Sequence, residues 1–184
     1  MKKKKILALI LAMTLVAACA VAGTLAWLTA KSDTVTNTFT TSGIEVTLTE
    51  TTGSDYKMVP GYEIAKDPKA TVLAGSEECY LFVKLEKSAN FDSFLTYGMA
   101  DGWTALDGAA GVYYREVASA DIGTAYSVLA DDKVAVKGTV SADMMEGLTA
   151  ATYPTLTVSA YASQLYKSAG VKFTPAEAWA NVAP

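Results

Sequence analysis

The residue types that most often do chemistry in proteins are scarce in this chain of 184 residues. It has no histidine, which removes the commonest general base and the commonest zinc ligand, and it has only two cysteines. Adjacent carboxylates at Glu77-Glu78 and Asp131-Asp132 could bind calcium, but such pairs are far more often solvated turns. No glycine-rich phosphate loop, CxxC pair or HExxH helix is present. The sequence therefore argues against an enzyme, and we expect no cofactor and no metal site.

Three weaker candidates for chemistry remain. The nineteen acidic residues could supply the carboxylate pair of a glycosidase, but nothing singles out one pair. A sugar-stacking face could be built from Tyr113, Tyr114, Tyr126 and Tyr161, although period-two spacing is more typical of a sheet surface and core. Cys79 lies in an apolar run, so we expect a buried thiol rather than a reactive one.

The first 26 residues have the parts of a secretory signal peptide. Lys2 to Lys5 form a basic segment, and Ile6 to Ala22 form an uncharged apolar one. Thr24 and Ala26 then place small residues at the −3 and −1 positions before Trp27. We therefore expect signal peptidase to cut the exported chain after Ala26.

Two other fates of the leader stay open. Val16 to Cys19 looks like a bacterial lipobox, in which Cys19 would be acylated and become the first mature residue. The apolar run from Ile6 to about Leu28 is long enough to span a bilayer, so an uncleaved anchor is the third interpretation. Under the expected cleavage, the chain meets the membrane only through its leader before processing.

Removing the leader makes the chain more acidic. The residues after Ala26 include eleven basic and nineteen acidic side chains, a formal charge of −8 against −4 for the whole sequence. Such a surface repels the phosphates of nucleic acids and of anionic lipids, so we expect neither as a partner. Only Cys79 remains, so no internal disulfide can form and the fold must depend on its core.

Apolar and polar side chains alternate along most of the mature chain, as they do in antiparallel strands. The clearest strands are expected at 44–49, 79–86 and 155–162. Others are expected at 70–73, 111–117, 126–130 and 133–140. Short helices are expected at 90–97, 141–148 and 174–179. This spacing predicts an all-β fold, a jelly-roll-like antiparallel β-sandwich with one to three short helices.

The most unusual segment is the new N-terminus at 27–42, ahead of an expected sandwich domain at 43–184. It has few charges, many threonines and no proline, and its alternation places Val35, Asn37 and Phe39 on one face. Its simplest interpretation is the first strand of the sandwich. The alternative is a donor strand that adds to the sheet of a neighbouring molecule and gives a head-to-tail contact that propagates.

Several short motifs occur together in a characteristic order. In the first half of the chain they begin with Gly23 to Thr29, Asn37 to Thr40, Gly43 to Val46, Met58 to Gly61 and Lys66 to Pro68. Further along they are Glu78 to Lys84 and Val158 to Gln164. In order and spacing these motifs resemble the TasA/camelysin family of Gram-positive bacteria.

The resemblance implies export by a SipW-type, signal-peptidase-dependent leader, and a jelly-roll-like sandwich outside the cell, at its surface or in the biofilm matrix. It further implies a structural subunit of extracellular fibres whose main partner is another copy, with the mature N-terminal strand complementing the next subunit. Some relatives are classed as metallopeptidases, but without histidine a conventional zinc site cannot be assembled here. The alternative function is a secreted or surface-attached accessory or binding module of the same fold that does not polymerise.

Overall fold

The computed structural model describes residues 43–53 and 56–184, together with residues 3, 4, 6, 8, 10 and 13. The chain divides into two units, Met1–Thr40 and Thr41–Pro184. The fold is that of the second unit, which is all-β, with antiparallel pairing between its strands and three short α-helices among its described residues. The expected all-β antiparallel sandwich with short helices is therefore confirmed.

Two sheets form the sandwich. One has the order β1-β3-β8, with bounds Val46–Thr49, Lys69–Val72 and Ala125–Ser127. The other has the order β10-β4-β7-β6, with bounds Leu156–Gln164, Cys79–Lys87, Val112–Val117 and Thr104–Ala105. A smaller sheet has the order β2-β9-β5, with bounds Glu63–Ala65, Lys133–Val136 and Leu95–Thr96.

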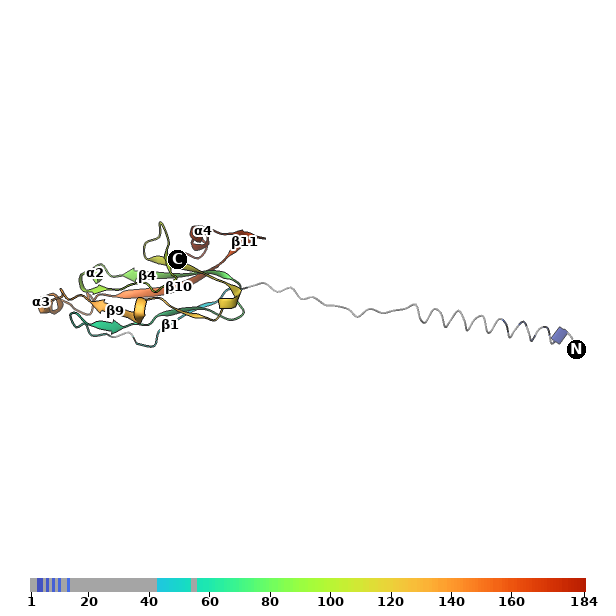
Figure 1. Cartoon of the computed structure of the whole chain (residues 1–184), viewed down its shortest axis with the longest axis horizontal. Coiled ribbons are helices and arrows are strands. Elements are labelled where there is room, and N and C mark those ends of the chain that lie inside the picture. Colours follow the sequence, from blue (N-terminus) through green and yellow to red (C-terminus); the bar gives the residue numbers. More distant parts are fainter. Residues whose placement is uncertain are drawn as a thin grey trace. The chain divides into compact units, whose positions relative to one another are not determined.

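The remaining elements lie around these sheets. A hairpin joins β11 (Tyr166–Ser168) to β12 (Val171–Lys172). The helices are α2 (Phe91–Phe94), α3 (Ala142–Glu146) and α4 (Pro175–Ala180), with short 3-10 turns at Ser119–Asp121 and Ala130–Asp132. Within this unit, α2 and α3 lie at one end and β11 at the other (Figure 1).

Strand β4 is the centre of the fold because both of its faces are buried. Its nine residues pair with β10 on one side, and its first six pair with β7 on the other. One face carries the expected row of inward side chains into the main core: Cys79, Leu81, Val83 and Leu85. Tyr80 and Phe82 on the opposite face belong to a second core.

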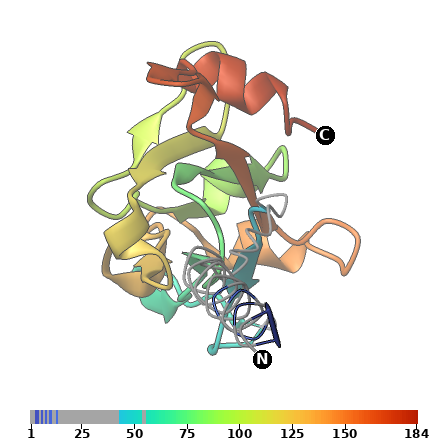
Figure 2. The ribbon, with the colours of Figure 1, turned by 90° about the vertical axis from the view of Figure 1, so that its right-hand side faces the viewer.

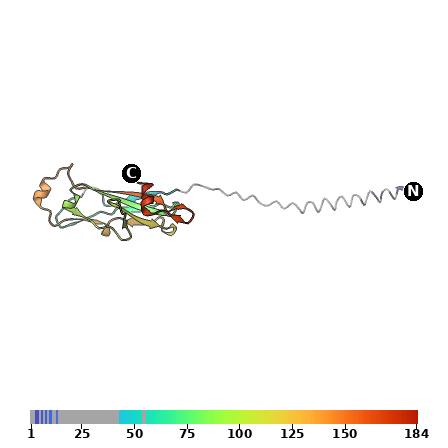
Figure 3. The ribbon, with the colours of Figure 1, turned by 90° about the horizontal axis from the view of Figure 1, so that it is seen from above.

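The second core is formed by α4 on the outer face of this sheet (Figures 2 and 3). The ring of Trp179 lies 5.3 Å, centroid to centroid, from the rings of both Phe82 and Tyr161. The expected capping box starts α4. Thr174 Oγ1 accepts a hydrogen bond from the Glu177 N–H at 3.2 Å, and the Glu177 carboxylate accepts one from the Thr174 N–H at 2.8 Å.

Two expected elements are shorter than their sequence patterns. The helix expected at 90–97 is only α2, because Leu95 leaves it to pair with Val136 of β9. Asn90 makes no side-chain cap; its Nδ2 instead donates to the Thr152 carbonyl at 2.8 Å. The strand expected at 133–140 ends at Val136, because the two strands that pair with it, β2 and β5, extend no further along it.

The tyrosines considered as a sugar-stacking face do not share one surface. Tyr113 and Tyr126 pack against the main core, whereas Tyr114 and Tyr161 pack against the second core. The sheet therefore separates the two pairs, and the sugar-stacking alternative is wrong for these four residues as a set.

Candidate functional site

The edge strands β1 and β10 approach one another along one side of the sandwich but do not pair with each other. β10 pairs with β4, and β1 pairs with β3; no strand of the described chain pairs with the other edge of either. An unpaired edge presents a row of free backbone N–H and C=O groups that can accept a further strand. This side of the fold is therefore a candidate interaction site.

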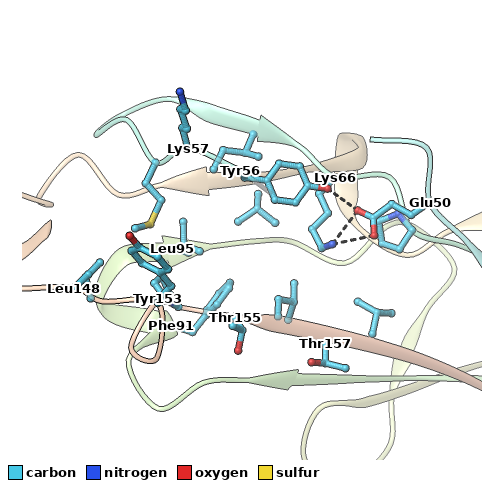
Figure 4. A pocket seen from close by; sticks show the side chains of 18 of the residues that line it. Glu50, Tyr56, Lys57, Lys66, Phe91, Leu95, Leu148, Tyr153, Thr155 and Thr157 are labelled. Carbon is cyan, nitrogen blue, oxygen red and sulfur yellow. Dashed lines mark hydrogen bonds and ion pairs between the residues drawn. The ribbon is translucent and has the colours of Figure 1, made fainter. Parts of the chain in front are cut away.

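A groove of about 1050 Å³ enters the molecule at this side (Figure 4). Its walls carry half-buried apolar side chains from three strands: Leu48, Ile64, Leu156 and Val158. Other lining residues are buried: Pro68, Phe91, Leu95 and Val134. The half-buried wall residues pack against the main core, so the groove leaves apolar side chains beside the core partly exposed.

One end of the groove is apolar and lightly packed. Met145 and Leu148, in and just after α3, line it together with Met58. Figure 4 shows Leu148 and Tyr153 together at this end, and Tyr153 is 54% exposed. No residue of α3 is buried, although Ser141 caps the helix by accepting a hydrogen bond from the Met144 N–H. Unbranched methionine side chains adapt readily to an incoming group.

The other end is closed by a polar cluster. Lys66 Nζ lies 2.8 Å from Glu50 Oε1, and Tyr56 Oη donates to the same oxygen at 2.9 Å. Lys66 Nζ also lies 5.5 Å from the centroid of the Tyr56 ring. Burial, aided by the Glu50 carboxylate, raises the pKa of Tyr56. Because these groups already satisfy one another, the cluster closes the groove and offers no free acid or base (Figure 4).

A carboxylate beside this cluster holds the chain between β1 and β2. Asp67 accepts hydrogen bonds from Thr51 Oγ1 at 2.5 Å, from the Thr51 N–H at 2.9 Å and from the Thr52 N–H at 3.1 Å. The bonds from Thr51, with those from Thr52, hold the pKa of Asp67 well below its usual range. Its role is to fix the loop that follows β1.

Strand β1 separates the start of the domain from the groove. At its beginning, Val46 pairs with Val72, and the Glu45 N–H donates to Ser76 Oγ at 3.0 Å. Past its other end, Glu50 lines the groove. The chain therefore begins the sandwich at one end of β1, and the groove opens toward the other end.

Comparison with known proteins adds no assignment. No family model, curated protein or solved structure matches this chain. The resemblance drawn from the motifs stays a prediction, and any functional proposal has to rest on the groove.

The structure does not describe the site residues that the sequence predicts. Two sets lie outside the described residues. They are the cleavage residues Thr24, Ala26 and Trp27, and the donor-strand residues Val35, Asn37 and Phe39. The groove itself was not predicted. Its one local signal is the apolar pair Met145 and Leu148, in and just after a helix of five residues with no buried side chain.

The other sequence candidates have structural roles. Cys79 is fully buried, and burial raises the pKa of its thiol to about 11, as expected for an inert cysteine. Asp131 and Asp132 form the expected tight connection, with φ of 54° and 52°. Within 43–53 and 56–184, no group of His, Cys, Asp and Glu could hold a metal. Among the residues that the structure describes, no helix has the length and apolar character needed to span a bilayer.

Proposed function

We propose that the chain is an exported structural protein, a subunit of extracellular fibres in a bacterial biofilm matrix. In this assembly, residues 27–42 of one molecule lie in the groove of the next. The observation that carries the proposal is the apolar groove beside the unpaired edge of β10. A strand placed there would both pair with that edge and cover apolar side chains that are now open to water.

The chemistry of the arm suits this groove. Val35 and Phe39 share one face of an extended segment with few charges. Full burial of either side chain against the groove walls would contribute about 1.5–3 kcal/mol to the free energy of association. Asn37 lies between them on the same face, and its amide can bond to backbone groups of the receiving molecule.

The position of the groove favours an open-ended assembly. The arm precedes β1 in the chain, and the groove is a surface of the sandwich lined in part by Leu48 of β1 and Glu50 just after it. An arm and a groove are two different surfaces, so their contact is heterologous and each added subunit leaves one groove and one arm free. Cleavage by signal peptidase after Ala26 would free the arm only once export is complete.

Two adjacent methionines of α3 give a matched test. Met145 lines the groove, whereas Met144 is 39% exposed and is not among the groove residues. For the exported chain, we expect Met145→Asp to abolish fibres in electron micrographs and to elute as a monomer in size-exclusion chromatography. Met144→Asp should form fibres like the parent chain, and circular dichroism should show both variants folded.

Two results would contradict the proposal. If both methionine variants form normal fibres, the groove is not the interface. If the unaltered exported chain remains a monomer at high concentration, the chain is instead an accessory or binding module of the same fold.

A further inference from the structure

The side of the sandwich opposite the groove is closed by the only arginine of the chain. Arg115 lies in β7, and its guanidinium meets two aromatic rings. Its Cζ is 3.7 Å from the centroid of the Tyr126 ring and 5.3 Å from that of the Trp103 ring. Such contacts hold a planar cation in place and remove water from its faces.

The neighbours of the guanidinium are themselves fixed. Trp103 Nε1 donates to the Ser127 carbonyl at 2.8 Å, which ties its ring to β8. Gly102 adopts a φ of +84°, and a Cβ at this position would lie 2.8 Å from Arg115 Nη2. Glycine therefore allows the backbone to approach the guanidinium this closely. Arg115 is held in one orientation from three sides.

The in-plane donors of Arg115 have no partner among the described residues. Nε is enclosed and has no hydrogen-bond partner there. No carboxylate of the same part of the chain lies within ion-pair distance of Arg115. By contrast, seven lysines do pair with acids: Lys66, Lys69, Lys84, Lys87, Lys133, Lys167 and Lys172. An enclosed donor without an acceptor is costly, and such exceptions call for an explanation.

We propose that Arg115, held between Trp103 and Tyr126, is a binding site for one carboxylate group. The Tyr126 ring lies over the guanidinium and Nε is enclosed, so a ligand must approach the outer edge that Nη1 and Nη2 form. A carboxylate is planar and presents two oxygens, which match these two donors. The formal charge of the chain, −4, disfavours a doubly charged phosphate at a site with a single cation.

The site is independent of the proposed fibre contact. Arg115 lies at the β7–β8 side of the sandwich, whereas the groove lies between β1 and β10. A carboxylate could therefore be bound by a free subunit or by a subunit within a fibre. The carboxylate could belong to a free small acid or to an acidic sugar.

The single arginine makes the test direct. The full chain has one arginine Nε–H, so one signal in a ¹⁵N nuclear magnetic resonance spectrum reports on this site without assignment by mutagenesis. We expect sodium acetate to shift this signal to saturation, with a dissociation constant on the order of 1 mM. At equal ionic strength and pH, sodium chloride should leave it in place. A shift that does not saturate, or that chloride reproduces, would overturn the proposal.

Glucuronate distinguishes the two sources of the carboxylate. If it saturates the same signal more tightly than acetate, the site favours an acidic sugar; if the two bind equally, it recognises the carboxylate of a small acid. Phosphate should bind more weakly than either, and tighter binding of phosphate would contradict the assignment to carboxylates.

A charge-conserving variant separates the fork from simple charge. Arg115→Lys keeps the positive charge but loses the planar donors, so acetate binding followed on the acetate methyl signal should weaken by about tenfold or more. The control is Lys57→Gln, which removes an exposed charge outside this site and should leave binding unchanged. Equal losses in the two variants would mean that acetate binding depends on net charge alone. If Arg115→Lys does not fold, the titration of the unaltered chain still tests whether acetate binds at Arg115.

Discussion

Leu81 and Phe82 are neighbours in β4 and are both fully buried, yet their side chains lie in two different cores. Leu81 packs between the two sheets, and Phe82 packs under α4 against Trp179. Both faces of the strand therefore contribute to stability, rather than one as in a sheet with a solvated face.

The first prediction concerns these two cores. Leu81→Ala should lower the free energy of unfolding by about 2–5 kcal/mol, and Phe82→Ala by about 3–5 kcal/mol, because both leave cavities. Thr47→Ala, on the side of β1 opposite Val46 and Leu48, should cost little. Denaturant melts of the three variants measure the differences. Small and equal losses would mean that the facing of these strands is wrong.

The second prediction concerns processing of the leader. Signal peptidases accept only small side chains at the −1 position, so Ala26→Trp should block cleavage. Mass spectrometry of the unaltered secreted chain should show Trp27 as its first residue. An acylated Cys19 at the N-terminus would show that the lipobox interpretation is right instead.

The third prediction concerns removal of the arm. A chain that begins at Gly43 retains every described strand of the sandwich, so it should fold, but it should form no fibres. Circular dichroism and electron microscopy measure the two properties. Normal fibres from this chain would refute the donor-strand proposal. Failure to fold would show that the segment is an ordinary first strand.

The fourth prediction concerns the face of the arm that enters the groove. Phe39→Asp should weaken fibre formation, because a charge would enter an apolar groove, while melting of the monomer stays almost unchanged. Thr38→Asp places the same charge on the opposite face and should be tolerated better. Light scattering during assembly compares the two, and equal effects would argue against one buried face.

The fifth prediction concerns acid stability at Asp67. The hydrogen bonds from Thr51 and Thr52 keep the pKa of Asp67 below its usual value in the folded state. Its stabilising effect is therefore present above the unfolded pKa of about 3.9 and is lost as the pH falls further below that value. Asp67→Asn should be less stable than the parent chain at neutral pH. The gap between their melting temperatures should close on acidification, and a gap that is independent of pH would contradict this account.

The sequence predicted the strands of the sandwich better than it predicted helix α2 and the groove. The alternation in 79–86 and 155–162 predicts the inward faces of β4 and β10 because the facing of a strand is set by neighbouring residues. Helix α2 is shorter than its pattern because pairing of Leu95 with the distant Val136 overrides local preference. The groove depends on β1 and β10 lying at sheet edges, which no local pattern encodes.

The same limit applies to Arg115. Its partners, Trp103 and Tyr126, come from segments on either side of β7, and the sequence gives no sign that they converge. Only the absence, among the described residues, of an acid within ion-pair distance distinguishes this cation from the paired lysines, since Asp121 acts on its charge from further away. By contrast, the capping box at Thr174 and Glu177 was predicted because all of its atoms come from one short segment.

The central position of β4 also constrains when the chain can fold during synthesis. Its longest pairing is with β10, which ends at Gln164. Its outer face is covered only when Trp179 of α4 packs against Phe82. Pairings between distant segments form slowly. The sheet around β4 is therefore incomplete in the nascent chain until β10 has emerged from the ribosome. If the chain is exported as proposed, this late pairing would help to keep it unfolded for translocation.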